Sequence, residues 1–287
     1  MACVACNSTE IRKLFPLREN RKYYICRCCN CWLEFLSPQP DISVLDAIYN
    51  TDYYGSWGIK DNYENVKNMK QATFDWIINM IKPYKRTGKL LDIWCATWFF
   101  MDIAQKKWFD VYWVDISREA VEKAQSIFWE NRVFNMSIDD FDIQIKFDVI
   151  VMTDLLEHVF DPLKTLQQIR KFLTEDGIVV VLSPHSDSLS RKLMGKYRVQ
   201  FKLEHLYYFT DKSIKSLCNK DWYNLIYSRI WIKKINFNYL FKQSKVYKLP
   251  IISYIIKLGN LILPNILKNH NFSMKFGEKL WILQKKF

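Results

Sequence analysis

Short apolar segments alternate with amphipathic segments through the middle of the chain, and this alternation limits the possible folds more than any other feature. The strand-like segments are residues 89–93, 110–115, 132–135, 147–152 and 178–182. Helical patterns fall between them at residues 99–107 and 162–172, after a longer helical stretch at residues 42–82. Strands that alternate with helices in this way predict an α/β fold with a doubly wound sheet.

The turn after the first predicted strand is the best functional clue. Residues 90–100 read LLDIWCATWFF, an apolar run that reaches an acid at Asp92 and then turns directly into a helix. In Rossmann-like sheets this arrangement brings the backbone close to a nucleotide-type ligand. Asp115 ends the second predicted strand, roughly 20 residues later, where an acid accepts the ribose hydroxyls of a bound nucleoside. Asp115 is equally suited to capping the helix that starts near Ser117.

These segments resemble the class I S-adenosylmethionine (SAM)-dependent methyltransferases over residues 85–230. The family's loop reads roughly LLDxGCGTGxF, and LLEHVFDPLKTLQQIRKFLTEDG at residues 155–177 resembles the motif after the family's fourth strand. The nearest group carries a zinc ribbon and is associated with glycan and sugar modification. The resemblance implies a Rossmann-like methyltransferase fold closed by strands at residues 223–229 and 279–285, the last of them antiparallel.

The resemblance also implies which residues serve the site. Those expected to bind SAM are Asp92, Trp94, Cys95, Ala96, Trp98, Asp115, Ile116, Ser137, Ile138 and Thr153. In the family the methyl group passes by in-line attack of an acceptor atom, so positioning does most of the work. The expected acceptor is a sugar, a glycan or another hydroxylated small molecule, with a lipid-linked acceptor as one version. For a hydroxyl acceptor the candidate bases are His158 and His205, although His158 is equally suited to holding its loop.

Glycine is scarce in this chain and tryptophan is abundant. The chain holds 7 Gly and 11 Trp, whereas average usage predicts roughly 20 Gly. Trp94, Ala96 and Trp98 stand where the family's loop has glycine, which tolerates positive φ and leaves room for a ligand. Other tryptophans at glycine-type positions are Trp32, Trp108, Trp113 and Trp222. We hypothesise that the gene reads UGA as glycine and was translated with UGA as tryptophan; the alternative is a non-catalytic pseudoenzyme or scaffold with a blocked SAM site.

Six cysteines lie within the first 31 residues, a density that favours metal binding over disulfides in a reducing compartment. Two C-x-x-C pairs have the spacing of a small zinc ribbon, and Cys26 with Cys29 offers an overlapping second choice. The family resemblance favours a structural zinc site made of Cys3, Cys6, Cys28 and Cys31. Reduced, metal-free thiols are the alternative.

A second metal hypothesis concerns the motif after the fourth predicted strand. Asp154, Glu157 and His158, with His205 added, resemble the divalent metal site of certain O-methyltransferases that act on quinone precursors or RNA ends. Carboxylates and imidazoles of this kind hold a cation that polarises a hydroxyl. The spacing alone permits this site but does not require it.

The carboxyl end is strongly basic. Residues 229–287 hold 12 Lys or Arg and one acid, Glu278, and thus carry most of the net charge of +12. The apolar run at residues 249–268 is interrupted by Lys257, Gly259 and Pro264, which indicates interfacial helices that could contact an anionic membrane. Packing of this run on the core or on a second subunit is the alternative. No RNA-binding module is recognisable, so nucleic acid is not an expected partner.

The whole chain therefore divides into three predicted parts. These are a zinc-ribbon-like module at residues 1–40, a helical linker or lid at 41–84, and the methyltransferase domain at 85–287 with a basic apolar insert at about 236–275. The first residues lack the apolar run of a signal peptide, and no apolar stretch reaches the roughly 18 residues of a membrane span. We expect a cytoplasmic protein, at the inner face of the membrane if the insert docks there.

Overall fold

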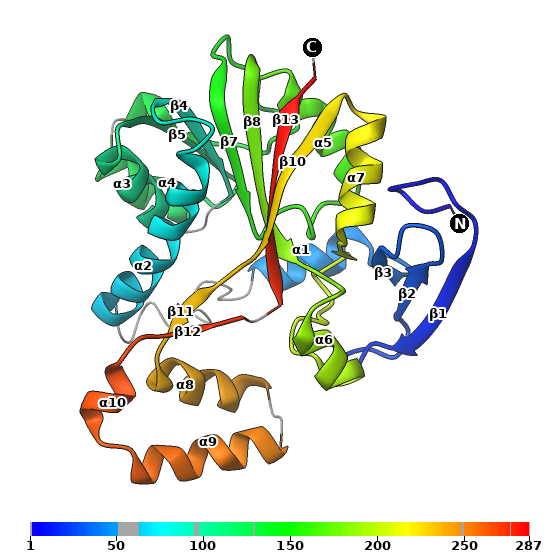
Figure 1. The fold of residues 1–287 in the computed structure, drawn as a ribbon, viewed down its shortest axis with the longest axis vertical. Coiled ribbons are helices and arrows are strands. Elements are labelled where there is room, and N and C mark those ends of the chain that lie inside the picture. Colours follow the sequence, from blue (N-terminus) through cyan, green and yellow to red (C-terminus); the bar gives the residue numbers. More distant parts are fainter. Residues whose placement is uncertain are drawn as a thin grey trace.

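The computed structural model describes residues 2–50, 63–94, 98–128, 130–247, 250–275 and 277–286. A seven-stranded sheet forms the centre of the molecule, in the order β10-β13-β8-β7-β4-β5-β6 (Figure 1). Its strands are β4 (Gly88–Ile93), β5 (Phe109–Asp115), β6 (Val133–Asn135), β7 (Phe147–Thr153), β8 (Leu173–Pro184), β10 (Tyr223–Ile230) and β13 (Glu278–Lys285). The pairs from β6 through β8 are parallel, whereas β13 is antiparallel to both β8 and β10. The predicted Rossmann-like sheet and its antiparallel last strand are confirmed.

Helices cover both faces of this sheet, which explains why its central strands are apolar along their whole length. In β7, Val149 and Val151 pack toward one hydrophobic core and Ile150 and Met152 toward the other. The first core includes residues of α2 (Tyr63–Ile81), α3 (Phe99–Lys106) and α4 (Arg118–Gln125). The second includes residues of α1 (Ile42–Asn50), α5 (Pro162–Arg170) and α7 (Asp211–Lys220).

One predicted boundary is wrong. We expected the fifth strand to begin at Ile178, but β8 already begins at Leu173. Leu173 is buried and pairs with Phe147 of β7. The register then shifts before the next pair, which is Val149 with Ile178. The strand is exposed at residues 175 and 176, which are both acidic. These two residues interrupt the apolar pattern, so the sequence does not predict a strand there.

The amino-terminal cysteines belong to a small antiparallel sheet in the order β1-β2-β3-β9. Its strands are β1 (Ile11–Pro16), β2 (Tyr24–Cys28), β3 (Glu34–Ser37) and β9 (Tyr207–Tyr208). The fourth strand comes from the distant segment that follows His205, with Phe35 paired to Tyr207. We call residues 2–37 the cysteine module. Its sheet is therefore shared with the methyltransferase part of the chain.

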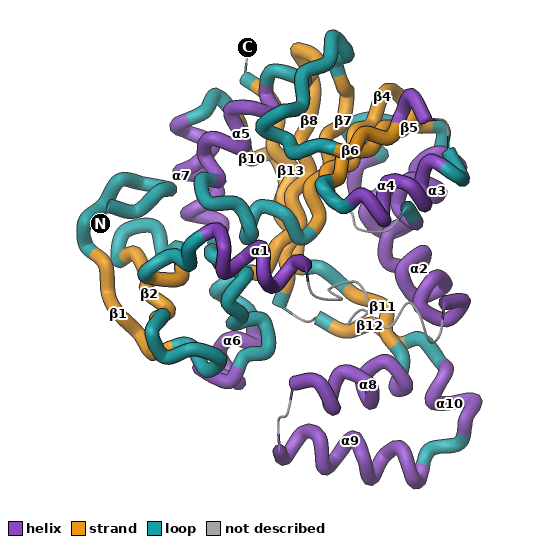
Figure 2. The backbone as a smooth tube through the Cα atoms, turned by 180° about the vertical axis from the view of Figure 1, so that it is seen from behind, coloured by secondary structure: helices purple, strands orange, loops and turns teal. Residues whose placement is uncertain are grey.

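The basic insert folds into helices at the end of the molecule opposite the carboxyl terminus (Figures 1 and 2). It comprises α8 (Phe237–Tyr247), α9 (Pro250–Ile262) and α10 (Asn265–Asn269), and a short two-stranded ladder of β11 (Lys233–Ile235) and β12 (Phe272–Met274) forms its base. No helix in the described residues is both long enough and apolar enough to cross a membrane.

Candidate active site and cysteine cluster

The site is built at the carboxyl ends of β4 and β5, which are adjacent and parallel. Trp94 follows β4, and its backbone N–H donates to the carbonyl of Val114 at 2.9 Å. Asp92 and Asp115 are both buried, and Asp115 accepts the backbone N–H of Ser117 at 2.8 Å. The cap of α4 is Ser117, whose side chain accepts from Ala120. Asp115 therefore lies at the edge expected for a ribose acceptor and is not the helix cap.

The other expected cofactor residues surround this edge. Ile116 is exposed beside Asp115, and Asn135 donates to the backbone carbonyls of both residues at 3.1 Å. Ser137 donates to Asp140 at 2.6 Å in the loop after β6, where Ile138 packs half-buried on the core. Thr153 is buried at the end of β7, while Cys95 and Ala96 lie outside the described residues. Sequence reasoning missed Asn135, for which a polar residue at the end of the third strand was the available signal.

The indole of Trp94 contacts one of the candidate histidines. Its ring meets His158 edge-on, with centroids 5.4 Å apart. Trp98 is the cap residue of α3, with φ −65°, and its ring contacts Phe99 at 4.7 Å. Asp115 is well placed to bind a nucleoside. A bulky ring at position 94, however, would keep the nucleoside from approaching the backbone closely.

Among the described residues, four tryptophans have a left-handed backbone. The φ angles are 60° at Trp32, 60° at Trp94, 75° at Trp108 and 52° at Trp222. A bulky residue rarely adopts this region, which glycine visits freely. The hypothesis of misread glycine codons named all four from the sequence. It also named Trp98 and Trp113, which do not share this backbone feature.

Two of these residues come just after the C-cap residue of a helix. Trp108 comes after α3 and Trp222 after α7, and their side chains are 82% and 61% exposed. Helices often end in a left-handed residue at this position, and that residue is usually glycine. By contrast, Trp281 is buried and its indole N–H donates to Asp211 at 2.7 Å, so this tryptophan suits its surroundings.

Two histidines and a glutamate form a compact group, in which Glu157 and His158 are buried and His205 is half-buried. One ligand atom from each of Glu157, His158 and His205 lies within 4.8 Å of the others. The two imidazole rings are 4.7 Å apart and nearly perpendicular. Burial lowers the pKa of both imidazoles well below the usual value, so both are neutral near pH 7.

The carboxylates of this region are also strongly affected by burial. Burial, followed by the charge of Asp154, raises the pKa of Glu157 well above its usual value. Neither oxygen of the Glu157 side chain has a hydrogen-bond partner among the described residues. Burial and then Glu278 raise the pKa of Asp154 to about 6. Asp154 is not part of the compact group, so three of the four residues in the second metal hypothesis come together.

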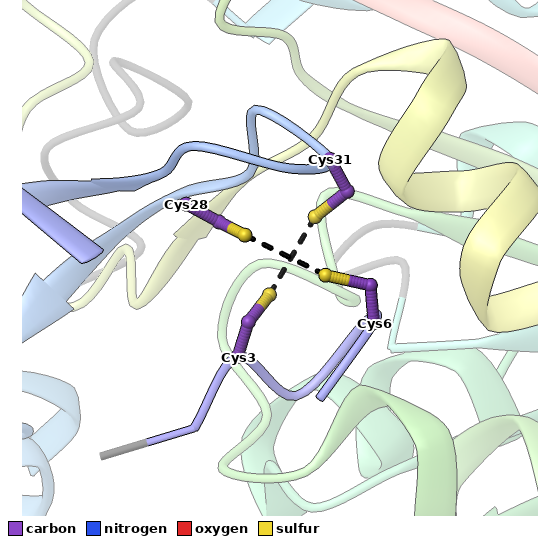
Figure 3. Close-up of side chains that lie close together, drawn as sticks. All are labelled: Cys3, Cys6, Cys28 and Cys31. Atoms are coloured by element: carbon purple, nitrogen blue, oxygen red, sulfur yellow. Dashed lines mark hydrogen bonds between the residues drawn. The ribbon is translucent and has the colours of Figure 1, made fainter. Parts of the chain in front are cut away.

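The four sulfurs of Cys3, Cys6, Cys28 and Cys31 point toward one another (Figure 3). The Sγ atoms of Cys3 and Cys31 are 3.5 Å apart, as are those of Cys6 and Cys28. Tetrahedral zinc with Zn–S bonds of about 2.3 Å places sulfurs about 3.8 Å apart. Cys29 is exposed and Cys26 is outside this group. Geometry thus distinguishes between the two overlapping pairs that spacing left open.

Two arginines in the segment between β8 and β9 make structural contacts. Arg191 donates to the buried Glu34 of the cysteine module at 3.0 Å through two nitrogens. Arg198 is buried and donates to the carbonyl of Gly277 at 2.8 Å. Both side chains are therefore committed to contacts within the chain.

Comparison with known proteins identifies the family. Residues 66–225 match the sequence profile of the methyltransferase domain family. This chain belongs to that family. By family and fold it is a class I SAM-dependent methyltransferase, as the sequence predicted. No curated protein matches it in sequence.

Solved structures show the same fold at low identity. One is a 1,6-didemethyltoxoflavin N1-methyltransferase from Burkholderia thailandensis, bound to 1,6-didemethyltoxoflavin and S-adenosylhomocysteine. It has a TM-score of 0.55 and 12% identity, and the match covers 96% of the present chain and 100% of the Burkholderia chain. The plantazolicin methyltransferase, bound to a substrate analogue and S-adenosylhomocysteine, has a TM-score of 0.52 and 14% identity, with 85% and 94% covered. The YcgJ protein from Bacillus subtilis has a TM-score of 0.50 and 16% identity, with 75% and 98% covered.

Proposed function

We propose that this methyltransferase transfers the methyl group of SAM to a hydroxyl of a small molecule, with a sugar or glycan as the preferred class. The observation that carries the proposal is the pair of buried acids at the carboxyl edge of two adjacent parallel strands, with Asp92 next to the end of β4 and Asp115 at the end of β5. SAM supplies an electrophilic methyl group when it is bound. The chain's own task is to hold the donor and to orient the acceptor.

The histidines supply the proton chemistry in this proposal. A neutral imidazole accepts a proton from an attacking hydroxyl, and burial keeps His158 and His205 neutral. His158 is nearer the loop, because its ring contacts Trp94. The two neighbours with named substrates act on a toxoflavin precursor and on plantazolicin, which supports a small-molecule or peptide-sized acceptor.

We also propose that the natural chain has glycine at positions 94 and 98, as UGA recoding would produce. The left-handed backbone at Trp94 supports this for the first position, and the family loop supports it for both. The competing proposal is a pseudoenzyme whose SAM site is filled by a genuine indole. A mass spectrum of the native peptide covering residues 90–106 distinguishes the two directly.

Calorimetric titration with SAM tests the site. We expect the Trp94→Gly/Trp98→Gly protein to bind SAM at least about tenfold more tightly than the tryptophan form, because the indoles no longer fill the loop. Trp32→Gly/Trp222→Gly is the matched control, since it relieves the same backbone conformation outside the site. A folded Trp94→Gly/Trp98→Gly protein without heat of binding would overturn the enzyme proposal.

A second candidate is a metal-assisted O-methyltransferase of a quinone precursor or RNA end. The specific observation in its favour is the group of Glu157, His158 and His205, with two carboxylate oxygens that lack hydrogen-bond partners among the described residues. Such a set suits a divalent cation that lowers the pKa of an acceptor hydroxyl.

Manganese binding tests this candidate independently of any acceptor. Electron paramagnetic resonance should show about one bound Mn²⁺ per chain, lost in Glu157→Gln. His185→Asn is the control, because His185 is a buried histidine outside the group. Equal Mn²⁺ binding by all three proteins, or by none, would reject the site.

We further propose that the cysteine cluster holds a structural zinc ion. Four thiolates leave no open coordination position, so this ion would take no part in transfer.

A further inference from the structure

We propose that the basic insert docks this methyltransferase on an anionic lipid surface, with the α9 and α10 side chains as the contact. One face of α9 carries apolar residues at helical spacing, namely Tyr254, Leu258, Leu261 and Ile262, all of them exposed. Leu261, Ile262 and, in α10, Ile266 are 82%, 79% and 84% exposed. These values are far above those of a side chain that packs within its own chain.

The opposite face of α9 is already packed. A Cβ atom added at Gly259 would lie 2.7 Å from the ring of Phe237 in α8, so the two helices meet closely at that point. The exposed apolar face is therefore not the side that stabilises the insert internally. In the described residues this face is exposed to solvent, on another side of α9 than the contact with α8.

Charge indicates which partner this face takes. From position 229 to position 275 the chain has nine Lys or Arg and no Asp or Glu. Lys257 is exposed on α9, one turn before Leu261, and Lys275 is exposed directly after β12. Lysines beside exposed apolar side chains suit a membrane surface, where the cations contact anionic headgroups and the apolar side chains contact the acyl chains beneath. The phosphate backbone of a nucleic acid would provide no apolar contact for Leu261 or Ile262. In this proposal the helices lie on the membrane surface, and no helix in the described residues is able to span the bilayer.

The position of the insert relates docking to catalysis. Glu278 pairs with Pro184 at the carboxyl end of β8, and β10 runs in the same direction as β8 because both are antiparallel to β13. The insert therefore leaves the sheet at the edge that carries the candidate active site. This arrangement supports an acceptor that is itself in the membrane. The choice of acceptor rests on the proposed function, whereas the docking proposal is independent of it.

Vesicle flotation of the full chain tests the docking. We expect binding to phosphatidylglycerol vesicles, little binding to phosphatidylcholine vesicles, and loss of binding in high salt. Leu261→Ser/Ile262→Ser/Ile266→Ser and, separately, Lys257→Glu/Lys268→Glu should each reduce binding at least about tenfold. Leu189→Ser/Leu193→Ser is the matched control, because these exposed apolar residues lie on α6 (Leu189–Met194), outside the insert.

Further measurements separate the competing outcomes. Unchanged circular dichroism in each variant would show that reduced binding is not misfolding. Equal flotation with both lipids, or equal loss in the α6 control, would overturn the proposal. If light scattering shows a dimer that the triple variant converts to a monomer, and no vesicles bind, the face belongs to a second copy of the chain. Failure of SAM binding alone leaves the docking proposal intact, since flotation needs no methyl transfer.

Discussion

At the scale of single residues, the backbone φ angle identifies positions that favour glycine or asparagine, whichever residue occupies them. Asn7 and Trp32 each follow the second cysteine of a C-x-x-C turn, and both have φ of 60°. In each turn this residue donates its N–H to the carbonyl of the first cysteine, at 2.8 Å from Asn7 and 3.0 Å from Trp32. Asparagine tolerates the left-handed region and tryptophan does not. The two equivalent turns thus demand the same kind of residue, and only the first has it.

Replacement of Trp108 tests whether this conformation costs stability. We expect Trp108→Gly to be about 1 kcal/mol more stable to urea than Trp108→Ala, because only glycine lacks the Cβ that opposes a left-handed backbone. Comparison with alanine removes the effect of losing the exposed ring. Trp76, in the middle of α2, is the control, and there glycine should be about 1 kcal/mol less stable than alanine. The same sign at both positions would contradict the proposal that 108 is a glycine position.

At the scale of elements, the cysteine module depends on contacts with α7 and the segment before it. Thr210, the cap of α7, donates from its hydroxyl to the carbonyl of Cys31 at 2.9 Å. Lys220 at the end of α7 donates to Val4 at 2.9 Å and to Asn7 at 2.7 Å. Both cysteine turns are therefore bound to the same helix, which holds the two halves of the cluster at a fixed separation.

Zinc analysis of two cysteine variants tests the cluster. We expect about one zinc per chain, lost in Cys28→Ser and retained in Cys29→Ser, because the Cys28 sulfur points into the cluster and Cys29 is exposed. Loss of the ion should also lower the melting temperature, since metal binding stabilises the folded state. Equal zinc in both variants, or none in the unmodified chain, would refute the assignment.

At the scale of the whole molecule, the sequence predicted the sheet well because its parallel strands are buried on both faces. Continuous apolar runs such as β7 therefore predicted closely where the strands lie along the chain. The pairing of β3 with β9 was not predictable, because Tyr207 and Tyr208 form only a two-residue strand with no periodicity. The cofactor and base residues stay predictions, although the structure brings Trp94, His158 and His205 together. The membrane role also stays a prediction, since apolar helices have the same composition whether they face the core or water.

The pairing of β3 with β9 has a consequence for synthesis on the ribosome. The first strands of the chain are made first, but their sheet is completed only when Tyr207 and Tyr208 have been made. Until then, the edge of β3 has no partner from β9, and Glu34 lacks the guanidinium of Arg191. The amino-terminal part of this protein must therefore wait, incompletely folded, for more than half of the chain to emerge. A nascent chain stopped before residue 207 should accordingly be sensitive to protease within its first 37 residues.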